Sequence, residues 1–170
     1  MRLDSLQDVL ADQIGDLRSA EQQLIEALPT MVAATHTDEL RAAFQNHLEE
    51  TRGHLQRLQD LIPTLGTTVP VETCEGMKGL LEEGEQIVSA EGDPMAKDAA
   101  LIAAAQRVEH YEIAAYGTAR TLADELGLDD AKDLLDQTLD EESSADKLLT
   151  KIATGGMFRS GINQEAAGRS

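Results

Sequence analysis

Apolar side chains recur at helical spacing along most of the chain. The pattern predicts four long amphipathic helices, over residues 4–34, 37–65, 94–126 and 129–153. In the first of them, intervals of three, four and seven residues separate the apolar positions Leu6, Leu10, Ile14, Leu17, Leu24, Leu28 and Met31. This spacing places all seven side chains on one face of an α-helix. Asp93-Pro94 gives the third helix an N-cap followed by proline in the first turn.

The lengths of the connections determine how these helices can be arranged. Only a few residues join the first helix to the second and the third to the fourth, so each pair must form an antiparallel hairpin. About 27 residues, 66–92, separate the two hairpins, and residues 74–90 within them predict one short helix. Two hairpins with one long crossover are typical of an all-α, ferritin-like four-helix bundle. We expect the bundle over residues 1–153 and a C-terminal tail, mobile unless it packs, over 154–170.

Composition and charge narrow the classes of partner. Aromatic residues make up only 2% of the chain, which disfavours an antiparallel β-sandwich or barrel. Thirty-two acidic residues against 14 basic ones give a net charge of −18, so we expect neither nucleic acid nor an anionic membrane as a partner. There is no apolar run long enough for a membrane span and no signal-peptide pattern, and the single Cys74 implies no internal disulfide. We therefore expect a cytoplasmic protein.

Several acidic side chains fall on the apolar faces of the predicted helices instead of the polar ones. Glu21, for example, lies between Leu17 and Leu24 in the stripe of the first helix. At about 1.5 Å of rise per residue, all of these side chains lie at one level of the bundle. The predicted inward-facing set is Glu21, Glu50, His54, Glu109, Glu112, Glu142 and Asp146.

A weak internal repeat supports part of this set. Residues 45–50 align with residues 137–142 at an offset of 92, which pairs Glu50 with Glu142 and His54 with Asp146. The alignment favours Glu142 over its neighbour Glu141, a choice that the helical wheel leaves open. His47 shares the inner face, but we expect it to support ligands or pack in the core. For Tyr116 we expect core packing, with a hydrogen bond to a ligand carboxylate as the alternative.

Six converging carboxylates would repel one another and lose hydration in a bundle core. Buried arginines, with Arg107 and Arg120 as candidates, are one way to offset the charge. A pair of divalent cations offsets the whole set at once, and we favour this interpretation. Oxygen ligands with one histidine suit iron or manganese better than a structural zinc. We therefore predict two Fe (or Mn) ions per chain, in the dimetal arrangement known from helical bundles.

The sequence also resembles a known family, the YciF-like (YciE/YciF) proteins, which are ferritin-like bacterial proteins of unknown function linked to stress. The resemblance spans residues 3–153 and is most specific over residues 98–117, DAALIAAAQRVEHYEIAAYG, with shorter matches over residues 19–24, 47–54 and 138–142. Members resemble rubrerythrin-type bundles. The resemblance implies a homodimer with a dimetal site, and residue-by-residue matching implies as ligands Glu21, Glu50, His54, Glu109, Glu112, Glu142 and Asp146.

The chain departs from the wider ferritin-like pattern at two positions. The usual Glu-x-x-His pair is replaced by Glu50 and His54, four residues apart, and Asp146 stands where a second histidine is usual. There is no Cys-x-x-Cys motif, so a self-contained rubrerythrin-type peroxidase is not supported. We expect a metal-binding protein with a stress-related role and redox or peroxide chemistry, of the di-iron oxidoreductase type if it is an enzyme. The alternatives are a non-enzymatic iron-binding or structural dimer and a shell-forming storage ferritin.

Overall fold

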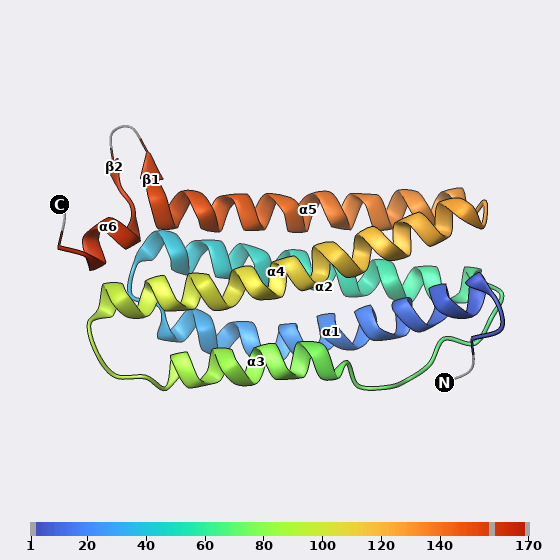
Figure 1. Ribbon diagram of the computed structural model, residues 1–170, viewed down its shortest axis with the longest axis horizontal. Helices are drawn as coiled ribbons and strands as arrows, with labels where there is room; N and C mark the ends of the chain where they lie inside the picture. Colours follow the sequence, from blue (N-terminus) through green and yellow to red (C-terminus); the bar gives the residue numbers. More distant parts are fainter. Residues whose placement is uncertain (1–2, 157–158, 169–170) are drawn as a thin grey trace.

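The computed structural model describes residues 3–156 and 159–168, and most of them are helical (Figure 1). The predicted helices are found within a few residues of their expected ends. The long helices are α1 (Leu6–Ala34), α2 (Asp38–Leu61), α4 (Pro94–Glu125) and α5 (Asp129–Thr154), and the crossover contains α3 (Glu75–Val88). Pro63, near the expected end of the second helix, falls in a 3₁₀ turn over Ile62–Thr64. The α-helix therefore stops four residues short of the predicted Leu65.

The long helices pack side by side as a bundle. The helix pairs α1 with α2 and α4 with α5 are antiparallel, and α1 also packs on α4 and α2 on α5 (Figure 1). The crossover runs the length of the molecule, and α3 covers the face formed by α1 and α4. Each of the four long helices therefore contributes one face to a common interior.

Local sequence signals set several helix ends. At the start of α1, the Ser5 hydroxyl accepts a hydrogen bond from the backbone N–H of Asp8. At the start of α4, the Asp93 carboxylate accepts a hydrogen bond from the backbone N–H of Ala96. The short turn from α4 to α5 passes through Gly127, whose φ of 67° lies in the left-handed region that favours glycine. Cys74 caps α3 through its buried sulfur, which fits a structural cysteine.

Two close contacts tie the connections to the bundle. The crossover passes so near α1 that a Cβ at Gly15 would lie 2.7 Å from the Pro70 carbonyl oxygen. At the other end of α1, the buried Asp98 carboxylate of α4 accepts from the backbone N–H groups of His36 and Thr37, both at 2.8 Å. Asp98 thus holds the α1–α2 turn against the second hairpin.

The hydrophobic core is divided into two parts. One cluster, which includes Leu24, Phe44, Leu101 and Leu149, fills the end of the bundle near the α1–α2 turn. The other, which includes Leu17, Leu58, Tyr116 and Leu135, fills the opposite end. Along every long helix, polar buried residues separate the two clusters: Glu21, His47, Thr51, His54, Glu109, Glu112, Thr138 and Glu142. The interior is therefore apolar at both ends and carries a layer of ionisable groups at mid-height.

The described part of the C-terminal segment is folded onto the bundle. Two short strands, β1 (Gly155–Gly156) and β2 (Arg159–Ser160), pair antiparallel, and the short helix α6 (Ile162–Ala166) packs on α4 and α5. Ile162 is buried in the apolar cluster near the α1–α2 turn. Residues 157–158 and 169–170 of the expected tail lie outside the described residues. Within the described chain, no helix is both long and apolar enough to cross a membrane.

Candidate metal centre

Two groups of buried side chains at mid-height are spaced closely enough to hold a metal ion. Within each group, one ligand atom from every residue lies within 4.8 Å of the others. The first group is His47, Glu109, Glu112 and Glu142, and the second is Glu21, His54 and Glu142. Glu142 of α5 belongs to both groups. The two groups together draw on all four long helices, and they form what we call the carboxylate–histidine cluster.

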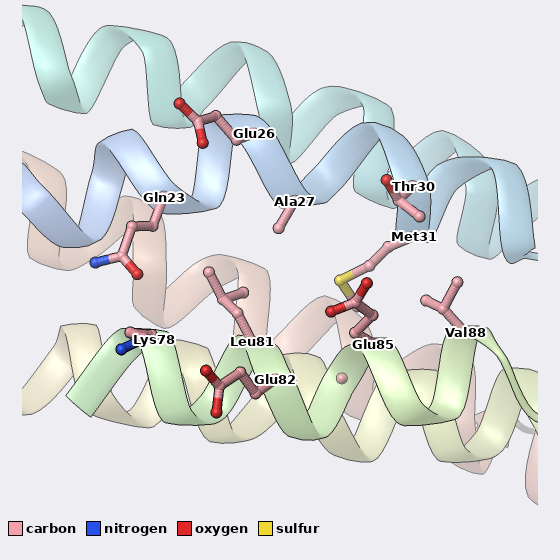
Figure 2. Close-up of a pocket in the computed structure, with 11 residues that line it drawn as sticks. Gln23, Glu26, Ala27, Thr30, Met31, Lys78, Leu81, Glu82, Glu85 and Val88 are labelled. Atoms are coloured by element: carbon pink, nitrogen blue, oxygen red, sulfur yellow. The ribbon is translucent and has the colours of Figure 1, made fainter. Parts of the chain in front are cut away.

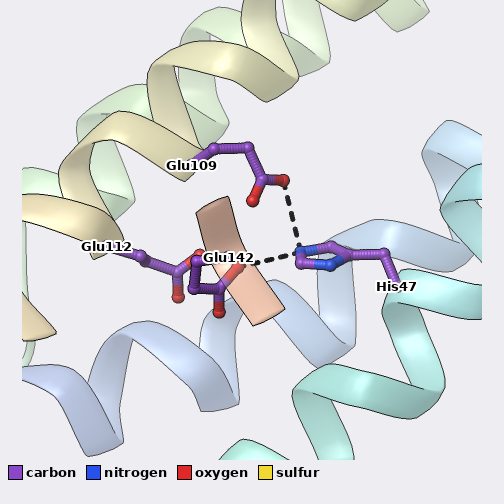
Figure 3. Close-up of side chains that lie close together, drawn as sticks. All are labelled: His47, Glu109, Glu112 and Glu142. Atoms are coloured by element: carbon purple, nitrogen blue, oxygen red, sulfur yellow. Dashed lines mark ion pairs between the residues drawn. The ribbon is translucent and has the colours of Figure 1, made fainter. Parts of the chain in front are cut away.

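The first group converges between α2, α4 and α5 (Figure 3). The His47 Nε2 atom lies 3.3 Å from Glu109 Oε1 and 3.9 Å from Glu142 Oε2. Glu112 follows Glu109 by one helical turn on α4, which brings both carboxylates to the same face. Figure 3 shows all four side chains pointing toward one region.

The second group lies deeper and joins α1 to α2 and α5. The His54 Nδ1 atom lies 2.8 Å from Glu142 Oε1 and 3.5 Å from Glu21 Oε1. All three side chains are inaccessible to solvent. The rings of His47 and His54 have their centroids 6.4 Å apart, so one imidazole lies beside each group.

The polar atoms of this cluster are poorly satisfied by the protein itself. Seven buried nitrogen and oxygen atoms on its six residues have no hydrogen-bond partner among the described residues, including both carboxylate oxygens of Glu112, once the His54 Nδ1–Glu142 Oε1 pair at 2.8 Å is set aside. Buried polar groups are normally paired, because leaving one unpaired costs about 1–3 kcal/mol. No lysine or arginine within the described part of the chain forms an ion pair with the four buried glutamates. A positively charged ligand would satisfy these atoms.

Burial and mutual repulsion raise the pKa of two carboxyls. Loss of hydration raises the pKa of Glu109 well above its ordinary value, and the charge of Glu142 adds to the effect. The pKa of Glu112 is raised in the same way, by burial first and then by Glu142, Glu21 and Glu109. Without a cation, both carboxyls therefore tend to hold protons. A divalent ion that binds there must displace them.

His54 and Glu142 stabilise each other as an ion pair. Burial lowers the pKa of His54, but contacts with Glu142 and Glu21 outweigh burial and raise this pKa to about 10. Burial raises the pKa of Glu142, but His54 and His47 outweigh it and keep that pKa below its ordinary value. The pKa of Glu21 is raised, because the effect of burial exceeds the lowering effect of its contacts with His54. In the metal-free protein, a protonated His54 therefore acts as the internal countercharge.

An outer ion pair fixes the orientation of His54. The Arg57 guanidinium donates two hydrogen bonds to the Glu141 carboxylate, at 2.6 and 2.9 Å. Burial raises the pKa of Glu141, but these hydrogen bonds and that from Gln137 outweigh burial and keep this pKa below its ordinary value. This ionised carboxylate can only accept, so the His54 Nε2–H donates to Glu141 Oε2 at 2.9 Å. The Nδ1 atom of His54 is thereby directed into the cluster. Histidine ligands of metals are commonly held by such a carboxylate contact on their second nitrogen.

Tyr116 combines the two roles considered from the sequence. Its ring is fully buried in the apolar cluster that also includes Leu17 and Leu135, and its hydroxyl donates a hydrogen bond to Glu21 Oε1. Burial and the Glu21 charge raise the pKa of this phenol well above its ordinary value, so it stays a donor.

The structure brings five of the seven predicted site residues together and leaves two at the margin. Glu50 does not point inward as expected: its side chain is 48% exposed, with Oε2 3.6 Å from His47 Nδ1. The buried stripe of α2 runs through His47, Thr51 and His54, and Glu50 lies on its edge. Asp146 is also off the inner face, where it accepts from Gln106 at 2.8 Å. Their roles as ligands remain predictions.

The predicted buried arginines do not reach the cluster. Arg107 is exposed, and Arg120 pairs with Asp136 near the surface, 2.8 Å away. The arginine that matters is Arg57, which acts through Glu141. Sequence reasoning missed Arg57, considered Glu141 only as an alternative to Glu142, and gave His47 a supporting role. The seven-residue interval between His47 and His54 is two helical turns, and it was the available signal that both face the same way.

A separate pocket lies between α1 and α3 and shares no residue with the cluster (Figure 2). Its volume is about 340 Å³, and Met31 and Leu81 point into it beside Glu26, Glu82 and Glu85. It lacks histidine and buried carboxylates. This pocket therefore offers no ligand set like that of the carboxylate–histidine cluster.

The donor set of the cluster fits divalent metal ions. Carboxylate oxygens with one imidazole nitrogen beside each group suit iron and manganese, and there is no thiolate to favour a structural zinc site. Seven unsatisfied buried atoms and a carboxylate common to both groups match the needs of two neighbouring cations. The buried acidic and histidine groups can thus hold metal.

Comparison with known proteins places this chain among proteins of the same size and fold. It is 39% identical to the protein YciF of Escherichia coli (strain K12) over 165 residues, which cover 96% of this chain and 99% of that protein. The crystal structure of the E. coli stress protein YciF matches with a TM-score of 0.85 and 41% identity, covering 88% of this chain and 94% of that one.

Two further solved structures are similar. YcfI from Rhodopseudomonas palustris matches with a TM-score of 0.84 and 36% identity, covering 90% of this chain and 99% of that one. A protein from Xanthomonas campestris, at 18% identity and a TM-score of 0.68, covering 86% and 89%, shares the fold. The model of the "Domain of unknown function (DUF892)" family matches residues 5–167, which include the folded C-terminal segment. The chain therefore belongs to the DUF892 family, which includes the YciF-like stress proteins, as the sequence resemblance predicted.

Proposed function

We propose that this protein is a ferritin-like dimetal protein that binds two iron or manganese ions at the carboxylate–histidine cluster. The observation that carries the proposal is the position of Glu142, which belongs to both groups of candidate ligands. A carboxylate has two oxygens and can serve two cations at once. In ferritin-like bundles, each helix supplies inward-facing carboxylates to such a pair of ions.

Each side chain of the cluster has a role in this proposal. His47, Glu109 and Glu112 would hold one ion, Glu21 and His54 the other, with Glu142 between them. Glu141 keeps His54 Nδ1 directed inward, and the Tyr116 hydroxyl holds Glu21 in place. The two apolar clusters on either side close the layer toward both ends of the bundle.

The chemistry that we propose is redox chemistry of the oxidoreductase type in a stress response. Bound iron or manganese supplies the capacity to react with dioxygen or peroxide. The chain itself contributes ligands, two oriented imidazoles and carboxyls that exchange protons when cations bind. The stress-related role draws on the name of the E. coli relative, which is called a stress protein. The homodimer implied by the family resemblance is part of the same proposal.

The proposal is tested by counting metal ions. The metal-free protein is incubated anaerobically with Fe²⁺ or Mn²⁺, desalted and analysed for metal and protein. We expect two ions per chain for the wild type and for Glu125→Gln, an exposed glutamate on α4. Glu142→Gln should retain at most one. Peroxide is then added to the iron-loaded protein, and rapid oxidation supports a redox role. Absence of bound metal would overturn the proposal.

A second candidate function is a protein that holds iron without turnover or serves as a structural dimer. The deep enclosure of the Glu21–His54 group and the absence of a Cys-x-x-Cys electron donor from the sequence favour this alternative. It predicts two bound ions that stay unreactive toward peroxide. A dimer in size-exclusion chromatography is consistent with both candidates and excludes a shell-forming storage ferritin.

A further inference from the structure

The two halves of the cluster differ in their access to solvent. A pocket of about 100 Å³ opens at the groove between α2 and α5, and its lining includes His47 and Glu109 from the first group. Glu21, His54, Glu112 and Glu142 do not line it. The pocket has room for about three water molecules. One half of the cluster therefore has an opening, and the other lies behind it.

The opposite side of the cluster is closed by protein. Glu141 and Arg57 form a bidentate ion pair beside His54, and Arg57 also donates to the Thr138 hydroxyl at 3.0 Å. On the α1 side, Glu21 meets the fully buried Tyr116. The pocket between α1 and α3 includes no member of the cluster.

The chemistry at the mouth of the pocket suits a small cation. Glu50 is the exposed carboxylate there, and its Oε2 lies 3.6 Å from the His47 ring. Its position at the edge of the buried stripe, outside the cluster, places a negative charge where an incoming ion meets the protein first. The net charge of −18 attracts cations toward the surface and repels anions. Leu148, which is 42% exposed, and Ala145 form the apolar part of the rim.

We propose that this pocket is the entry route for divalent cations, with Glu50 as the receiving carboxylate and the Glu21–His54 group filled through the His47–Glu109 group. The proposal rests on the proposed function, because it describes how the same cluster acquires its ions. The ion passes from Glu50 to His47 and Glu109. Glu142 belongs to both this outer group and the inner Glu21–His54 group, so it connects the two. The outer half therefore exchanges its ion faster than the inner half.

The test measures the rate of metal uptake by the metal-free protein. Co²⁺ is mixed with the protein in a stopped-flow instrument, and the visible absorbance of the bound ion is followed. Leu148→Trp narrows the mouth and should slow uptake at least about tenfold, while the final number of bound ions stays at two. Lys147→Trp, at an exposed position of the same helix that does not line the pocket, should bind at the wild-type rate.

A second variant separates passage from folding. Leu148→Ala widens the mouth and should bind Co²⁺ at least as fast as the wild type. If Leu148→Trp binds two ions at the wild-type rate, or if Leu148→Ala is slowed as much as Leu148→Trp, the entry route is wrong and the dimetal function stands. If the wild type binds no Co²⁺, Fe²⁺ or Mn²⁺ at equilibrium, the dimetal function itself is wrong.

Discussion

The Nε2 atom of His54 lies 2.9 Å from Glu141 Oε2, and this contact directs the Nδ1 atom of the same ring into a buried group of carboxylates. Glu141 is in turn held by Arg57, so the orientation of a buried imidazole depends on an ion pair near the surface. The charge of Arg57 stays outside the cluster, which leaves the interior carboxylates available to a cation.

Replacing Glu141 should weaken metal binding without unfolding the protein. Glu141→Gln removes the negative charge that fixes the Nε2–H tautomer of His54. Substitutions at such supporting positions lower metal affinity by about 10–100-fold. The affinity is measured by Mn²⁺ titration. Glu49→Gln is the matched control, because Glu49 is an exposed glutamate that pairs with Arg52. An unchanged affinity in Glu141→Gln would show that His54 needs no such support.

Neutralising one buried carboxyl should stabilise the metal-free protein while it weakens metal binding. Glu112 is fully buried, and neither of its oxygens has a hydrogen-bond partner in the described part of the chain. The raised pKa keeps a proton on Glu112 at neutral pH, where the unfolded chain would release it. Glu112→Gln removes the free-energy cost of holding that proton, and we expect an increase of about 1 kcal/mol or more in the free energy of unfolding at neutral pH. Chemical denaturation with and without metal measures both effects. A metal-free variant less stable than the wild type would contradict this expectation.

The stability of the metal-free protein should fall as pH rises above the acidic range. Folding raises the pKa of Glu109 and Glu112, so their stabilising protonation is complete below about 4.5 and is lost as pH passes through the raised values. Protonated His54 acts in the same direction. Its contribution to the stability of the fold is complete below pH 6.5 and is lost as the pH rises through its raised pKa of about 10. The lowered pKa of Glu142 has the opposite sign, and its contribution is lost only in acid, below 4.5.

Thermal unfolding across this pH range tests the expectation. The melting temperature of the metal-free wild type should decrease from mildly acidic to alkaline pH. In Glu109→Gln the decrease should be shallower, because one of the protons is no longer involved. With metal bound, the dependence should weaken or reverse, since cations replace the protons. Identical slopes for the wild type and this variant would exclude the carboxyls as the source.

Asp98 should contribute to stability and not to metal binding. It accepts from two backbone N–H groups in the α1–α2 turn, at His36 and Thr37. Asp98→Ala leaves both donors without this partner, and we expect a loss of about 2 kcal/mol or more. Glu109 lies eleven residues further along the same helix, about 16 Å away. Unfolding curves should therefore shift while Mn²⁺ affinity per folded chain stays constant, and a parallel loss of affinity would contradict this separation.

Much of the fold was predictable because its signals are local. The apolar stripe of α1, the Asp93-Pro94 start of α4 and Gly127 after it each act within a few residues. The same periodicity identified Glu21, Glu109, Glu112 and Glu142 as buried, since each interrupts an apolar stripe at mid-helix. The preference for Glu142 over Glu141 as the inward residue, which came from the internal repeat, is confirmed by their burial.

The remaining features depend on contacts between distant segments. A helical wheel places Glu50 and His47 on the same arc of α2. Only the packing of α2 against α5 determines that His47 points inward and Glu50 outward. The Arg57–Glu141 pair joins residues 84 positions apart, which no local pattern encodes. The internal repeat suggested that Asp146 would mirror His54, but Gln106 and His110 of α4 hold Asp146 at the edge.

The central claim is that two metal ions share Glu142, and a crystal structure of the Mn²⁺-loaded protein tests it most directly. Diffraction at a wavelength where manganese scatters anomalously locates the ions independently of the protein. The account predicts two anomalous peaks, one beside His47 and Glu109 and one beside His54 and Glu21, each within bonding distance of a Glu142 oxygen. A fully loaded protein with peaks only at surface carboxylates, or with none in contact with Glu142, would contradict it.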